Sequence, residues 1–140
     1  MVDHPSKHSY TMTLKTHFQL GSLDDCDLRG ATLQAATFEG VSLCGCNFEG
    51  ADLSFCEFYM VPAIGANFQG SKLIGARFCG GTFACANFTN CDLSDAIFLA
   101  DNMGGAVDLS ASDFTGAKLD NSRFASVITD VQTKLSDPGV

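Results

Sequence analysis

The sequence predicts an all-β solenoid: one domain whose backbone turns once in every five residues around a dry axis. Three observations predict it. A Phe or Leu recurs every fifth residue from Phe18 to Phe124, a small residue precedes most of them by two positions, and a Gly often follows by two. Steps of five would spread apolar groups around a whole helix and would alternate faces on a flat strand. Neither element could therefore bury this pattern on one side.

The five-residue lattice has 22 positions, of which 20 are Phe or Leu. The exceptions are Ala63, where the core should be thin, and Met103. One extra residue interrupts the rhythm near Gly104, where we expect a bulge or a corner loop. The recurrent Gly allows the positive φ that a repeated turn requires.

The repeat unit carries a family resemblance. The segments CDLRG (26–30), CNFEG (46–50) and ANFQG (66–70) resemble the A(D/N)LXX motif of the pentapeptide-repeat proteins, and the resemblance extends over residues 16–125. It implies a right-handed quadrilateral β-helix in which four pentapeptides make one coil, giving about five coils here. The period alone does not select four sides. With four sides, residues 20 apart stack in columns.

Both ends of the repeat are predicted to be covered. Residues 1–15 form an N-terminal arm in which Tyr10, Met12 and Leu14 alternate with polar residues, a strand pattern that could cover the first coil or pair with a second chain.

Residues 126–140 form the C-terminal cap and tail. Within them Val127, Ile128, Val131 and Leu135 have near-helical spacing, which predicts a short amphipathic helix over the last coil.

Composition excludes several classes of protein. There are 16 acidic and 8 basic residues, a net charge of −8, and the scattered bases make no patch for direct nucleic-acid binding. No apolar run is long enough to span a membrane, and no secretory h-region is visible. The odd count of 7 cysteines does not suit a closed disulfide framework, so we expect reduced thiols and a cytoplasmic location.

The cysteines and histidines indicate no metal or cofactor site. Cys26 and Cys46 should stack in adjacent coils, close enough for a disulfide on distance alone, but we interpret them as small core residues. Cys44 and Cys79 are expected to point outward and to be reactive. His4 and His8 have Pro5 between them, which indicates a polar arm. No nucleophile motif, phosphate loop or carboxylate pair is recognisable, so no catalysis is expected.

Stacking also predicts the outer columns. Glu57 should lie beside Arg77, and Arg29 beside Glu49. One column should contain Asp52, Lys72, Asp92 and Asp113, and another Asp27, Asn47, Asn67, Asn87 and Asp108.

One side departs from this polar pattern and is the candidate interface. It carries outward apolar residues, with two more at its corners and one on the following side, and a contiguous apolar patch marks a contact surface. The candidate residues are Phe55, Tyr59, Met60, Ile64, Cys79, Ile97 and Leu99.

The sequence therefore predicts a non-catalytic interaction or scaffold module that presents a rigid surface to a protein partner, either another protein or a further copy of itself. The family resemblance implies an alternative, an acidic DNA-mimic regulator of a type II topoisomerase. The net charge of −8 supports that alternative. Interleaved bases, a short rod and the lack of a large loop argue against it.

Overall fold

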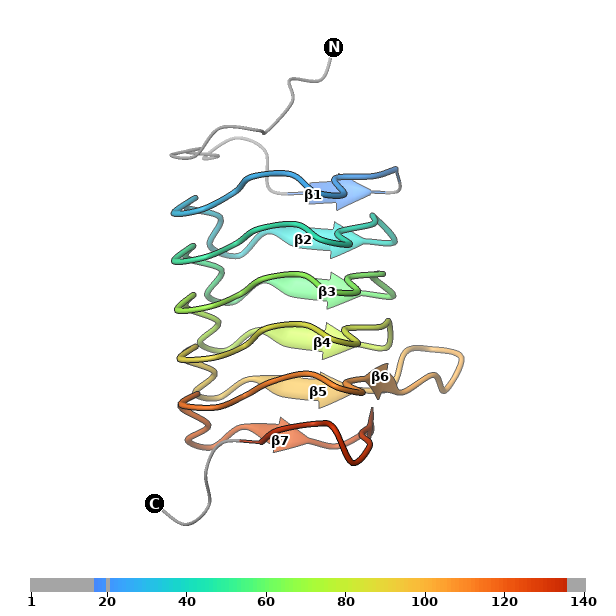
Figure 1. Ribbon diagram of the computed structural model, residues 1–140. Coiled ribbons are helices and arrows are strands. Elements are labelled where there is room, and N and C mark those ends of the chain that lie inside the picture. Colours follow the sequence, from blue (N-terminus) through green and yellow to red (C-terminus); the bar gives the residue numbers. More distant parts are fainter. Residues whose placement is uncertain (1–16, 20, 136–140) are drawn as a thin grey trace.

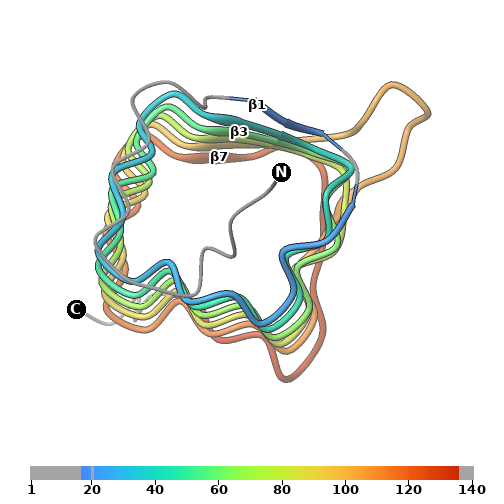
Figure 2. The same ribbon diagram turned by 90° about the horizontal axis from the view of Figure 1, so that it is seen from above.

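The computed structural model describes residues 17–19 and 21–135, which form a right-handed β-helix with four sides (Figures 1 and 2). Viewed from above, the coils lie over one another and the chain runs clockwise as it moves away from the viewer. Right-handedness and the four-sided section agree with the expectation from the family resemblance. We number the coils from the one that begins with β1.

One side consists of short parallel strands, and residues of neighbouring coils pair at a spacing of 20, as Phe58 does with Phe78. The order in this sheet follows the chain, and the last pairing joins β5 to β7. The strands of the sheet are β1 (His17–Gln19), β2 (Thr37–Glu39), β3 (Glu57–Tyr59), β4 (Arg77–Cys79), β5 (Ile97–Leu99) and β7 (Arg123–Phe124). A second pair is formed by β6 (Val107–Asp108) and β8 (Val127–Ile128).

On the other three sides, an Asp, Asn, Ser or Thr before the inward side chain often caps the backbone two positions on. Asn67 Oδ1 accepts the Gln69 N–H at 3.0 Å, and Asp92 Oδ1 accepts the Ser94 N–H at 3.0 Å. These are Asx turns. On the sheet side the same position holds His, Thr, Glu, Arg or Ile, and the chain there is extended.

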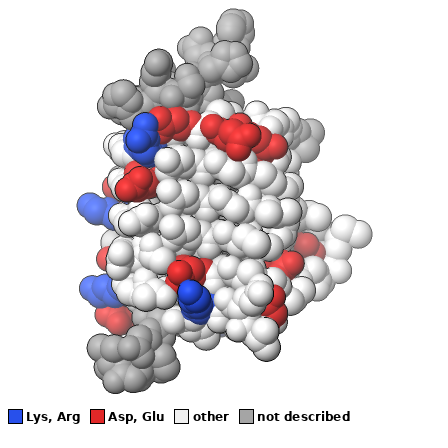
Figure 3. Space-filling view, in the orientation of Figure 1, with Lys and Arg blue, Asp and Glu red and all other residues white. Residues whose placement is uncertain are grey.

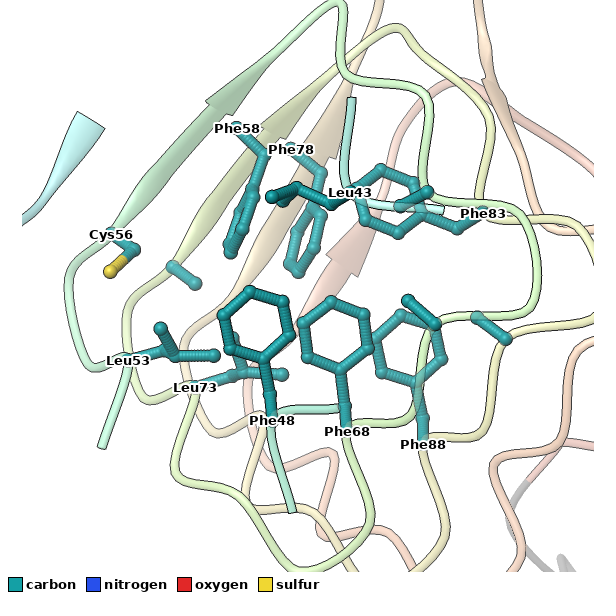
Figure 4. Packing of buried hydrophobic residues seen from close by; sticks show 14 of the residues in the cluster. Leu43, Phe48, Leu53, Cys56, Phe58, Phe68, Leu73, Phe78, Phe83 and Phe88 are labelled. Carbon is teal, nitrogen blue, oxygen red and sulfur yellow. The ribbon is translucent and has the colours of Figure 1, made fainter. Parts of the chain in front are cut away.

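The lattice Phe residues form two stacked walls of the core (Figure 4). On the sheet side the rings from Phe18 to Phe98 stack at centroid distances between 4.4 and 5.1 Å. The rings from Phe48 to Phe114 stack at 4.7 to 5.0 Å on the opposite side. The two walls meet edge to face, as Phe58 and Phe68 do at 87°. Both geometries are favoured for aromatic pairs.

The thin spot predicted at Ala63 is filled from the next coil. Phe83 follows Ala63 in the same column, and its ring contacts Phe58 at 5.9 Å and Phe68 at 6.1 Å, both of which belong to the coil of Ala63. A large ring therefore compensates for the small residue before it, and Ala63 is fully buried.

The interruption of the repeat is larger than predicted. Thr82 pairs with Asp108, a spacing of 26 instead of 20, so six residues (101–106) are inserted at one corner and project from the rod (Figure 2). Met103 lies in this loop and is 83% exposed, so its assignment to the core lattice was wrong.

The insertion also moves two predicted column partners. Asn87 pairs with Asp113 in place of Asp108, and Asp92 pairs with Lys118 in place of Asp113. Met103 falls on the five-residue spacing by coincidence. The sequence pattern therefore indicated an insertion of one residue, although six residues are inserted.

The predicted C-terminal helix is absent: residues 126–135 contain no helical turn and continue the coil. Val107 N–H donates to Ser126 O at 3.0 Å, and Leu109 N–H donates to Ile128 O at 2.8 Å. The open edge of the fifth coil offers unpaired backbone groups, and pairing with them outweighs a weak helical preference. The arm 1–15, with His4, His8 and its strand pattern, lies outside the described residues.

Candidate interaction surface

The candidate interface centres on the outer surface of the strand side, which we call the sheet face. It is bounded by the corner before each strand and the corner after it. Two outward columns cross it. The first contains His17, Thr37, Glu57, Arg77, Ile97 and Arg123, and the second contains Gln19, Glu39, Tyr59, Cys79 and Leu99.

Tyr59, Cys79 and Leu99 form an unbroken apolar stretch of the second column. They belong to β3, β4 and β5, whose backbones pair directly. Tyr59 and Leu99 are half-buried, whereas Cys79 is only 7% exposed because it stands between two larger neighbours. The prediction of a reactive thiol at Cys79 was therefore wrong, and burial raises the pKa of its thiol.

The first column holds one ion pair in the middle of the face. Arg77 Nε lies 3.6 Å from Glu57 Oε2, as the predicted stacking required, and Ile97 follows in the next coil. The Arg77 and Glu57 side chains are 48% and 42% exposed, so both can reach another molecule. An exposed isolated pair contributes little to stability.

A strained aromatic residue occupies the corner before β3. Phe55 has φ 63° in a position where other coils have Gly75 or Ala35, and its side chain is 64% exposed. A Cβ built on Gly75 would lie 2.6 Å from the Phe55 ring, so the ring covers the corner of the next coil. A bulky residue at positive φ is rare, and such strain concentrates at functional sites.

Met60 holds the corner after β3, with φ 53° and 39% exposure. Six of the seven candidates thus lie on the sheet face or at its corners. Five of these six, all except the buried Cys79, are exposed or half-buried and surround the Glu57–Arg77 pair. Ile64 is 50% exposed but belongs to the following side, around the corner from Met60.

Two exposed groups were missed by reasoning from the sequence. Met103 is held at the loop by Asp101, whose Oδ1 accepts the N–H groups of Met103 at 2.8 Å and Gly105 at 2.9 Å. The Asp-Asn-Met-Gly-Gly run was the available signal, because Asx and Gly residues mark loops. Cys85 is the exposed cysteine, and it stands at positive φ in a corner position where other coils have Gly.

The face opposite the sheet is polar and has a different character. In Figure 3 its charged side chains lie toward the two ends and along both edges, leaving a largely uncharged middle. Asn47, Asn67 and Asn87 stack in this region, and Asn67 Nδ2 donates to Asn47 Oδ1 at 3.2 Å. Arg29 lies beside Glu49 of the next coil, as predicted, and forms its ion pair with Asp27 of its own coil at 2.6 Å.

Two further features are absent from the described residues. They contain no group of three or more His, Cys, Asp or Glu side chains placed to hold a metal ion. They also form no helix of the length and apolar character needed to cross a membrane.

These features define a class: a repeat rod with a filled interior, which can meet other molecules through its outer sides. The chain belongs to the pentapeptide-repeat family. The family described as Pentapeptide repeats matches residues 22–59 and 64–98 with 8 copies, which is just over half of the chain.

The chain is also similar, at low identity, to several solved structures. A structure of QnrB1, a plasmid-mediated fluoroquinolone resistance protein, is 19% identical with a TM-score of 0.44, covering 94% of this chain and 84% of that one. Rfr23 from the cyanobacterium Cyanothece 51142 is 24% identical with a TM-score of 0.29, covering 84% and 63%. A thylakoid-lumen pentapeptide repeat protein of Arabidopsis thaliana is 25% identical with a TM-score of 0.24, covering 73% and 60%. Comparison with curated proteins gave no match.

Proposed function

We propose that this protein is a non-catalytic binding module whose sheet face docks a protein chain. The observation that carries the proposal is the grouping of Phe55, Tyr59, Met60, Ile97 and Leu99 around one ion pair on the flattest side of the rod. Protein interfaces combine an apolar, aromatic-rich centre with a few polar groups.

The strain at Phe55 supports the same surface. Gly would occupy a positive-φ corner at less cost, yet this corner carries a ring that is 64% exposed. Exposed aromatic residues on a rigid support are frequent anchors of binding energy because little side-chain entropy is lost on docking.

A photo-reactive phenylalanine analogue in place of Tyr59 tests the proposal in cells that produce the protein. We expect cross-linked protein adducts from position 59 and none from the same analogue at Thr89, which lies on the opposite, polar side. The double change Tyr59→Asp with Leu99→Asp should abolish binding of the cross-linked chain while circular dichroism and melting stay unchanged. No adduct from position 59 would refute a docking role for this face.

DNA mimicry of a type II topoisomerase substrate is the second candidate, because the acids are unevenly spread. Among the described residues up to 65, one base, Arg29, accompanies seven acids: Asp24, Asp25, Asp27, Glu39, Glu49, Asp52 and Glu57. Several of these carboxylates are already engaged within the chain, as Asp27 is with Arg29 and Asp52 with the Ser54 N–H. This engagement weakens the candidate relative to the docking module.

A gyrase supercoiling assay at two salt concentrations separates the two candidates. A mimic would inhibit at low micromolar protein, and its inhibition would weaken steeply as salt rises because exposed charges are screened. A docking module is expected to leave supercoiling unchanged at both concentrations.

We also propose that the protein works in a reducing, cytoplasmic compartment. All seven cysteines are free, and two buried thiols donate hydrogen bonds that a disulfide could not: Cys56 Sγ to Leu33 O at 3.0 Å and Cys91 Sγ to Phe68 O at 2.7 Å. Alkylation of denatured protein taken from cells should modify all seven thiols without reductant.

A further inference from the structure

We propose that the sheet face binds a second copy of this chain in an antiparallel arrangement, with β3 of each copy facing β4 of the other. The inference rests on the proposed docking function and names its partner. Two patterns on the third and fourth coils and the corners before them carry it, namely their charges and their residue sizes, and the dimensions of the face set the expected strength.

The charges of these two coils are complementary to themselves. Glu57 of β3 and Arg77 of β4 occupy the same column one coil apart. A two-fold axis that runs parallel to the strands, between β3 and β4, places Glu57 of each copy opposite Arg77 of the other. The four groups then alternate in sign, and each is paired within its own chain and across the interface. Networks of this kind hold charges better than an isolated surface pair.

The sizes of the outward residues follow the same rule. Around β3, the residues at the corner before the strand, outward on the strand and at the corner after it are large: Phe55, Tyr59 and Met60. At the matching positions around β4 they are small: Gly75, Cys79 and Gly80. The axis between β3 and β4 therefore places each large residue of one copy opposite a small residue of the other, and the symmetry repeats each contact with the two copies exchanged. An isologous interface requires this self-complementarity.

Other two-fold arrangements fit less well. An axis centred on β4 would bring Arg77 against Arg77 of the second copy. A two-fold axis along the rod would place each residue of the first column opposite the second-column residue of the same coil in the other copy. Arg77 would then face the small, buried Cys79. Charge therefore selects the axis between β3 and β4.

The dimensions of the face set the expected strength. Five residues at about 3.3 Å and six strands at about 4.8 Å give a footprint on the order of 500 Å². A standard stable interface buries about 800 Å² of accessible surface per partner, so the dimer should be weak, with a dissociation constant in roughly the micromolar range.

Sedimentation equilibrium of the full chain with reductant, from about 5 to about 500 µM, is the first experiment. We expect a reversible monomer–dimer equilibrium. The variants Glu57→Arg and Arg77→Glu should each shift it at least about tenfold toward monomer, because each creates four like charges at the centre. Lys72→Glu, a charge change on a different side, should leave it unchanged.

Mixing the two variants gives the decisive result. In a heterodimer of Glu57→Arg with Arg77→Glu, every facing pair regains opposite charges, so the equimolar mixture should associate as the original chain does. Both variants must first show the original circular dichroism and melting, which separates loss of binding from loss of fold.

The proposal is overturned if the original chain stays monomeric at every concentration, or if the mixed variants do not associate. Failure of the proposed function has a different signature. Adducts from position 59 that contain only a different protein would refute the self-association and preserve the docking role, whereas no adduct at all would refute both.

Discussion

The burial and packing of an individual side chain in this fold depend on the residues of the neighbouring coils. Cys79 points outward and yet is buried by Tyr59 and Leu99, which are twenty residues away in either direction. Phe83 fills the space left by Ala63 in the preceding coil. The strands are about 4.8 Å apart, so a side chain's nearest neighbours are those above and below it.

Gly81 offers a residue-scale prediction with a matched control. Gly81 and Gly104 have φ values of 85° and 84°, but a Cβ on Gly81 would lie 2.6 Å from Val61 O, while Gly104 has open space. Both Ala substitutions incur about 1–2 kcal/mol for the left-handed backbone. Val61 O accepts the Thr82 N–H at 3.0 Å and cannot retreat without disturbing the ladder.

We therefore expect Gly81→Ala to lower the free energy of unfolding by at least about 2 kcal/mol more than Gly104→Ala. Urea denaturation of the two variants measures the difference. Equal losses of unfolding free energy in the two variants would show that the Val61 backbone moves at little energetic cost.

At the scale of elements, the residue before each inward side chain contributes to the local choice between strand and turn. Asp and Asn there cap the local backbone and give tight sides, as Asp113 does for the Thr115 N–H at 2.9 Å. Glu57, Arg77 and Ile97 offer no such cap, and their side is extended. Pro62 and Lys72 offer none either, yet the chain turns after them, so the missing cap alone does not produce the flat sheet face.

The corner loop gives the element-scale prediction. Removing residues 101–106 restores the spacing of 20 between Thr82 and the following coil. Together with Ala100→Gly, which supplies the corner glycine found at Gly40 and Gly80, this deletion should leave the melting temperature within about 5 °C.

Removing only 102–106 leaves one residue too many at the corner and is expected to melt at a lower temperature, because the surplus must be accommodated as a bulge. Thermal unfolding followed by circular dichroism compares the two deletions. If the longer deletion melted lower, the loop would have to stabilise the rod.

At the scale of the whole molecule, the buried thiols limit the stability of the fold at alkaline pH. Burial raises the pKa of Cys56 from 9.0 to about 12 and that of Cys91 to about 11. As the pH rises, the unfolded chain releases these protons before the folded chain does. The stability that the neutral thiols contribute is therefore complete below pH 9 and is lost as the pH rises toward 11 and 12.

We expect the free energy of unfolding to fall steeply above about pH 9, and to fall less steeply in Cys56→Ala and Cys91→Ala. The same change at the exposed Cys85 serves as the control. Urea denaturation across this range measures the slopes. Identical slopes in all four proteins would contradict the assignment to buried thiols.

Much of the molecule follows from local periodicity. A Phe or Leu every fifth residue predicted the solenoid and almost all of its core, and the spacing of twenty predicted the Glu57–Arg77 pair. Outward apolar residues also predicted most of the sheet face. These features were accessible because each depends on a residue's position within its own repeat.

What the tertiary structure alone decided involves contacts between coils. The sequence spacing placed Met103 in the core, but the pairing of Thr82 with Asp108 excludes it. The near-helical spacing after Phe124 predicted a cap, yet the open edge of the fifth coil recruits Val127 into a strand. Periodicity within one coil specifies which residues face inward. Unpaired backbone groups and space left by residues twenty positions away determine how the coils are completed, because buried hydrogen bonds and close packing must be satisfied across the whole stack.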